Sequence, residues 1–341
     1  MEPMRNDFVQ AYERAAPAGG NTSTSVISAV RSHSFAITRR HLQIALGFLW
    51  LLDGALQLQS FMFTTGFAKQ IISPTGDGQP VVVAGPVHWG ASLIAAHPLP
   101  WGIAFAAIQL LIGLALFVPR TARLALGASI AWGLGVWYFG ESLSGLASGH
   151  ASLITGAPGS VLLYVLLALA AWPPRDRSEV APARWLPFAW AALWIGAAIF
   201  QALPGQNTGT DVAGLIGSSG NPGWLNRVDA SVSGWIGGHG LFVVIALVAA
   251  EVLIGVGALL RRSLAVAAAT GFVLALAIWV VGQSFGGLYT GQATDPNTAP
   301  LIALIAVVLL SGVRSRDSSG FATAIRRRRL QPKAVFATSP A

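Results

Sequence analysis

The sequence contains no cysteine and very little charge. Its 341 residues include 21 Lys and Arg, 13 Asp and Glu and no Cys, so only 10% of them are charged. Without cysteine the chain can form no disulfide, no thiolate metal site and no cysteine nucleophile. Soluble domains carry roughly 25% charged residues. The low charge therefore argues against a soluble domain and indicates a chain surrounded by lipid.

Motifs of ATP-driven pumps and soluble hydrolases are also missing. The sequence has no Walker A loop, no GxGxxG fingerprint, no HExxH and no GxSxG. The net charge is +8, but the basic residues are spread over loops and the tail rather than gathered on one surface. We therefore expect no nucleic-acid partner. The expected partner is the lipid bilayer.

Apolar stretches dominate what is present, since 54% of the residues are hydrophobic. Eight stretches could cross about 30 Å of hydrocarbon as helices. They cover residues 41–63, 101–118, 121–140, 158–172, 185–203, 239–260, 263–282 and 299–313. This pattern predicts an all-α, polytopic membrane protein with eight transmembrane helices.

The basic residues fall on one side of this arrangement. Of the 21 Lys and Arg, 19 lie in the N-terminal arm, in every second connection or in the C-terminal tail, and only Lys69 and Arg227 lie in the other connections. Basic residues mark the cytoplasmic side of short loops. We therefore expect the bacterial cytoplasmic (inner) membrane, with both termini cytoplasmic and the long, Gly-rich loops outside.

An internal repeat divides the chain into two halves. At an offset of 142, residues 137–158 align without gaps on 279–300 and share nine of 22 positions, including Trp137/Trp279 and Pro158/Pro300. A unit with an even number of crossings enters the membrane in the same direction each time, so the two four-helix repeats should be parallel.

Five segments follow from the repeat and the charge pattern. We expect a disordered cytoplasmic arm at 1–38, a first four-helix repeat at 39–173, a cytoplasmic linker at 174–184, a second repeat at 185–313 and a basic cytoplasmic tail at 314–341. The tail holds Arg326 to Arg329 and Lys333. These side chains should either contact anionic lipid headgroups, at about 1 kcal/mol for each charge, or serve as a solvated anchor of the topology.

Two carboxylates fall inside predicted membrane helices. Asp53 lies in the first and Glu251 in the sixth, and Gln57 follows Asp53 by one helical turn, within hydrogen-bond reach of it. The repeat equivalent of Glu251 is Gln109. Intramembrane acids mark ligand or proton pathways, but neutral polar residues that join helices are an equal alternative.

The repeated outer segment supplies further candidates. Glu141 and His150 in the first copy become Gln283 and Gln292 in the second. Ser142, Gly145 and Gly149 are spaced to lie on one face of a helix, or the segment could be a Gly-rich stretch that lines a cavity. The ligand or proton-pathway candidates are Asp53, Gln57, Gln109, Glu141, His150, Glu251 and Gln283.

The histidines are weak metal candidates, and we expect no metal. His88, His97, His150 and His239 face outside in this topology, but none has the close spacing of a metal motif. His97 and His239 share a repeat position and should each open a transmembrane helix, which fits an interfacial cap.

The start of each half resembles the DoxX/DoxD-like family of four-helix bacterial membrane proteins. Arg39, Arg40, Gly47 and Gly54 follow the order of that family's first helix, and Glu251, Gly255, Gly257, Arg261 and Arg262 follow its second. The resemblance covers about three helices of each half and implies a membrane subunit linked to thiosulfate–quinone electron transfer. It carries over no catalytic residue, and this chain departs from the family in being duplicated.

Three functions are left open by the sequence. The resemblance favours a redox-associated or quinone-interacting membrane subunit, with quinone as the cofactor it suggests. Asp53, Glu251 and the parallel repeat favour a proton-coupled carrier for a small solute. A scaffold or assembly factor without a site of its own is the third hypothesis.

Overall fold

The computed structural model describes residues 37–173, 183–216 and 222–313, and it contains only helices and connections in these ranges. The prediction of an all-α chain is therefore confirmed for the described residues. The predicted arm up to residue 36, linker residues 174–182 and the basic tail, with Arg326 to Arg329 and Lys333, lie outside them.

Each of the eight predicted apolar stretches contains a helix. The first half has α3 (Arg39–Leu56), α4 (Val81–Ala96), α5 (Pro98–Phe117), α6 (Ala122–Phe139) and α7 (Ser160–Ala171). The second half has α8 (Leu186–Gln201), α9 (Gly209–Ile216), α10 (Gly223–Leu259), α11 (Leu264–Val281) and the helix Thr298–Val313. Of these, α4 and α9 lie outside the predicted stretches.

Three of the described helices, α5, α10 and α11, are long and apolar enough to cross a membrane. Their outward faces carry large exposed apolar side chains, among them Leu111 (65% exposed), Phe242 (69%) and Val273 (65%). Exposing such a surface to water costs about 25 cal/mol of free energy per Å² of apolar area. These helices are compatible with a membrane protein.

The two longest of the predicted outer loops contain α-helices or π-helical turns, which corrects the sequence analysis. The first holds a π-helical turn (Phe67–Ile72), a 3₁₀ turn (Ser73–Gly76) and α4. The second holds α9 and the first part of α10, so His239 lies inside α10 instead of opening a helix there. His97 does precede α5 as its N-cap. Both outer segments fold because they bury apolar clusters, for example Val212 and Ile216 against Ile236.

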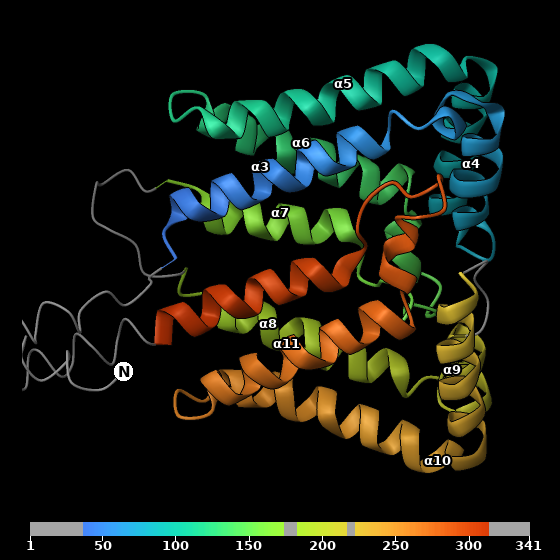
Figure 1. Ribbon diagram of the computed structural model, residues 1–341, viewed down its shortest axis with the longest axis vertical. Coiled ribbons are helices and arrows are strands. Elements are labelled where there is room, and N and C mark those ends of the chain that lie inside the picture. Colours follow the sequence, from blue (N-terminus) through green and yellow to red (C-terminus); the bar gives the residue numbers. More distant parts are fainter. Residues whose placement is uncertain (1–36, 174–182, 217–221, 314–341) are drawn as a thin grey trace, which may run out of the picture. The chain divides into compact units, whose positions relative to one another are not determined.

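The helices are arranged with their connections at two opposite ends (Figure 1). The α5–α6 and α10–α11 connections lie at the end where α3 begins, while α4 and α9 lie at the other end. The connections at the first end carry Arg120 and both Arg261 and Arg262. Arg40, at the start of α3, donates hydrogen bonds to the carbonyls of Leu116 and Phe117 that end α5, which satisfies otherwise unpaired helix-terminal groups.

The core runs through both halves. The short helix α7 and the helix Thr298–Val313 lie in the middle of the bundle (Figure 1) and bury most of their side chains, including Leu163, Leu167, Leu301 and Ile305.

The repeated outer segment forms left-handed turns, so the predicted helical face through Ser142, Gly145 and Gly149 is wrong. Residues 142–145 have φ between +51° and +79°, and the equivalent residues 284–287 have φ between +47° and +68°. An L-residue in this conformation costs roughly 1–2 kcal/mol. The same fold of the backbone therefore occurs twice, 142 residues apart, and it ends α6 and α11 in the same way.

We expect Gly286→Ala to destabilise the protein more than Gly287→Ala. Both residues have positive φ, so either alanine should cost about 1–2 kcal/mol. A Cβ on Gly286 would also lie 2.6 Å from the Pro296 carbonyl carbon, whereas a Cβ on Gly287 would have no neighbour closer than 3.5 Å. Overpacking adds about 1–3 kcal/mol. Unfolding temperatures of the purified variants in detergent would check this, and equal losses would contradict it.

Candidate functional site

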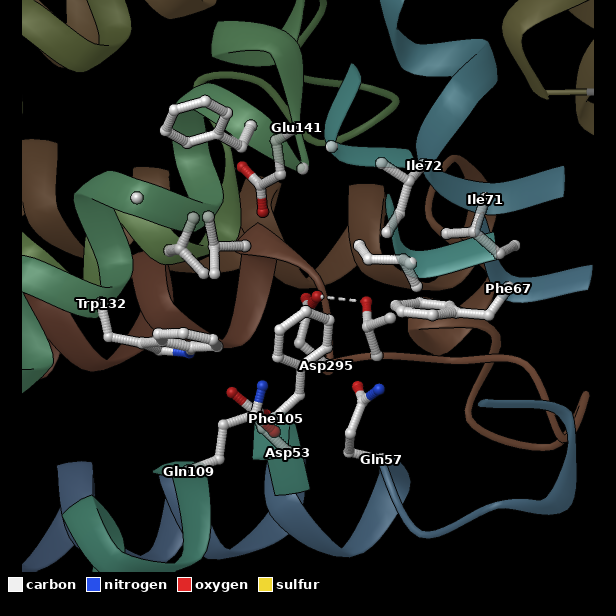
Figure 2. Close-up of a pocket in the computed structure, with 18 of the residues that line it drawn as sticks. Asp53, Gln57, Phe67, Ile71, Ile72, Phe105, Gln109, Trp132, Glu141 and Asp295 are labelled. Carbon is white, nitrogen blue, oxygen red and sulfur yellow. Dashed lines mark hydrogen bonds between the residues drawn. The ribbon is translucent and has the colours of Figure 1, made fainter. Parts of the chain in front are cut away.

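A cavity of about 360 Å³ lies among the helices of the first half. Its described lining comes from α3, α4, α5, α6 and α7, from the π-helical and 3₁₀ turns before α4, and from the loop that precedes the helix Thr298–Val313. Figure 2 shows its polar side chains converging from opposite walls, with aromatic rings between them. The polar and aromatic lining residues are Trp50, Asp53, Gln57, Phe67, Thr75, Phe105, Gln109, Trp132, Phe139, Glu141, Thr294 and Asp295.

One wall of the cavity presents Asp53, Gln57 and Gln109, which are 2%, 2% and 9% exposed. Asp53 and Gln57 share one face of α3 because they are four residues apart. The hydrogen bond expected between their side chains does not form: Asp53 Oδ1 and Gln57 Nε2 have no hydrogen-bond partner, nor has Gln109 Oε1. Both α3 side chains instead extend into the cavity (Figure 2). Unpaired buried polar atoms are costly and call for a ligand or water.

Glu141 enters the cavity from the opposite wall, just after α6 ends. Ser160 Oγ donates to its Oε1 at 3.0 Å and Ser144 Oγ donates to its Oε2 at 3.1 Å. Burial, and then the nearby Asp295 carboxylate, raise the pKa of Glu141 to about 8. The left-handed turn thus places one serine hydroxyl on an acid that keeps its proton near neutral pH.

The third acid, Asp295, comes from the second half of the chain. Its carboxylate accepts hydrogen bonds from Thr294 Oγ1 at 2.8 Å and from the Asn297 backbone N–H at 2.7 Å. Sequence reasoning missed this residue because it lies in a loop and its repeat equivalent is Leu153. The available signal was Asp-Pro-Asn in a loop, a turn sequence, but it does not show which cavity the loop reaches.

Two loops cross between the halves, and we call residues 149–156 and 291–298 the crossing loops. Gln59 Nε2 donates to the Ala293 carbonyl at 3.3 Å, and Gln206 Nε2 donates to the Gly149 carbonyl at 3.3 Å. Each loop is therefore held by a glutamine of the other half. The second crossing loop brings Thr294 and Asp295 to the cavity.

The remaining predicted site residues lie elsewhere. Glu251 is 1% exposed within α10, and its Oε2 has no partner, but it does not line the cavity. Gln283, the equivalent of Glu141, donates to the Leu153 carbonyl and Thr298 Oγ1 and accepts from the Ala299 N–H. His150 is exposed. The structure thus brings together Asp53, Gln57, Gln109 and Glu141 of the predicted set.

The histidines are scattered. His88 Nε2 lies 3.4 Å from Asp77 Oδ1 on the surface, and His239 stacks on Trp235 with ring centroids 4.6 Å apart. His97 and His150 are exposed. Within the described ranges, no three His, Asp or Glu side chains lie close enough to hold a metal ion. The three cavity acids therefore face a shared space rather than one ion.

Comparison with known proteins gives no relative: no protein-family model, curated protein or solved structure matches this chain. The resemblance to DoxX/DoxD-like proteins remains a prediction.

We expect the folded protein to lose stability as the pH rises from about 4.5 to 8. Glu141 has an ordinary pKa of 4.5 and a folded-state pKa of about 8, so the folded state holds this proton more tightly and ionisation favours unfolding in that window. Glu141→Gln should make the stability of the folded protein change less between pH 4.5 and 8.

Unfolding temperatures at pH 5, 6.5 and 8 in detergent would test this. Asp77→Asn is the matched control, because 75% of the Asp77 side chain is exposed. Its unfolding temperature should change with pH as that of the parent protein does. Parallel curves for Glu141→Gln and the parent would contradict the assignment.

Proposed function

We propose that the chain crosses the bacterial cytoplasmic membrane eight times as two parallel four-helix repeats, with both termini in the cytoplasm. Support comes from α6 and α11, which both have 18 residues and whose bounds differ by 142 positions, and from the left-handed turn that follows each. The basic connections gather at one end of the bundle, as cytoplasmic loops do.

Single cysteines would test this topology, since the parent chain has none. Asp77→Cys and Asn207→Cys should react with an impermeant maleimide in intact spheroplasts. Pro119→Cys and Arg261→Cys should react only after permeabilisation. All four positions are exposed, so poor access would not explain a failure. Labelling of the two pairs from the same face would contradict the topology.

Within this frame, we propose a proton-coupled carrier for a small solute that binds in the first-half cavity. The supporting observation is the convergence of Asp53, Glu141 and Asp295, from three distant segments, on one cavity. An acid that gains or loses a proton where a solute binds links the two events, because each changes the free energy of the other. Ionisable residues in bundle interiors commonly serve such pathways.

Uptake into proteoliposomes should require the cavity acids. An imposed pH gradient should drive accumulation of at least one member of a mixed set of small amines, carboxylates and sugars, measured by mass spectrometry. Asp53→Asn and Glu141→Gln should each lower the initial rate at least tenfold. Asp77→Asn is the control, as its acid is exposed and does not line the cavity, and should leave the rate unchanged. No gradient-driven accumulation by the parent protein would contradict the proposal.

A quinone-interacting, redox-associated membrane subunit is the second candidate. It is favoured by two unpartnered donors in the cavity, Trp132 Nε1 and Gln57 Nε2, because quinone oxygens accept hydrogen bonds. Binding of a short-chain ubiquinone, followed by its absorbance and weakened in Trp132→Phe, would support this function. A non-catalytic scaffold would be favoured if the cavity variants changed thermal stability alone.

A further inference from the structure

We propose that the ligand of this cavity is a small organic cation, an amine or quaternary ammonium compound with apolar substituents. The inference rests on the proposed solute-binding role of the cavity and names the class of solute. It depends on the charge, the rings and the unpaired atoms of the lining.

The charges of the lining have one sign. Asp53, Glu141 and Asp295 line the cavity, and its described lining includes no Lys, Arg or His. Like charges in a poorly hydrated space oppose one another, and they are relieved by protons or by a cation. A proton on one acid removes part of the repulsion between the carboxylates. A bound cation would offset the charge of the carboxylates that remain ionised.

The rings of the lining suit a cation that carries apolar groups. Trp50, Phe67, Phe105, Trp132 and Phe139 all face the cavity, and Phe105 and Trp132 lie with ring centroids 5.5 Å apart. A cation over such rings is attracted to their negatively charged faces, with Trp the best partner. Quaternary ammonium groups are held in aromatic cages by this interaction. Inorganic ions would leave most of a cavity of about 360 Å³ unfilled.

The unpaired atoms point to the same ligand. By hydrogen-bond geometry Asp53 Oδ1 and Gln109 Oε1 are buried acceptors without a partner, and both residues line the cavity; the buried Tyr164 hydroxyl is a protein group that interacts with Asp53. The N–H of a primary, secondary or tertiary ammonium would satisfy both atoms directly, whereas a quaternary ammonium would be attracted to Asp53 by charge alone. Gln109 is uncharged, so its free acceptor is an observation separate from the charge of the lining.

Paired probes can separate charge from shape. Isothermal titration of the purified protein with benzyltrimethylammonium and with its uncharged carbon isostere, neopentylbenzene, compares a cation with a neutral molecule of the same form. The cation should bind at least tenfold more tightly. Asp53→Asn and Asp295→Asn should each weaken cation binding at least tenfold and leave the isostere unchanged. Asp77→Asn, at an exposed acid that does not line the cavity, should bind the cation as the parent does.

The outcomes decide between the class of ligand and the carrier function. Equal affinity for the two probes, no cation binding, or full binding by both Asn variants with parental unfolding temperatures would overturn the cation proposal. If a variant unfolds, the parent's preference between the probes still tests it. Cation binding without gradient-driven uptake would support the cation proposal and contradict the carrier function. Gradient-driven uptake of uncharged or anionic solutes alone would support the carrier function and contradict the cation proposal.

Discussion

The separation of apolar and polar side chains in this bundle is the constraint on which the rest of the structure depends. The outer helices expose Leu111, Phe242 and Leu253, whereas Asp53, Gln57 and Glu251 are almost fully buried. In water this arrangement would be unfavourable on both counts, because apolar area would be wetted and polar groups desolvated. In lipid only the cost of desolvating polar groups remains. This cost is smaller where polar groups share a cavity or pair with one another. The interior polar residues therefore need hydrogen-bond partners, which can be one another, a ligand or water. They must lie where such a partner can reach them.

The crossing loops meet this constraint differently in the two halves. The first crossing loop carries Leu153 and Ile154 into apolar surroundings, where Ile154 packs with Val212 and Ile236. At the positions equivalent to Leu153 and Ile154 the second loop has Asp295 and Pro296, and it delivers a carboxylate to the first-half cavity. The two crossing loops thus contribute opposite chemistry, and their backbones differ too, since the first forms turns over residues 153–158 while the second leads into a helix at Thr298. The first half thus receives the Asp295 carboxylate from the second half, and the second half receives the apolar contacts of Ile154.

The sequence predicted the helices well and the site in part. All eight apolar stretches contain helices because long apolar runs have few other ways to satisfy their backbone hydrogen bonds. Asp53, Gln57, Gln109 and Glu141 were identified because an acid or amide in an apolar run is conspicuous. Asp295 was missed because it lies in a loop, where an acid is ordinary, and only the crossing of the loop gives it a role. The i, i+3, i+7 spacing of small residues predicts a helical face where the structure has left-handed turns, because this spacing does not reveal the sign of φ.

The packing around two buried indoles differs between the two halves. In the first half the Trp50 indole donates to Ser129 Oγ at 2.9 Å. The residue 142 positions after Ser129 is Gly271, where a Cβ would lie 2.4 Å from Cζ2 of Trp190. An indole therefore fills the second half where the first half keeps a hydroxyl. The unpaired polar atoms of the first-half cavity lower the stability of the protein wherever neither a ligand nor water satisfies them.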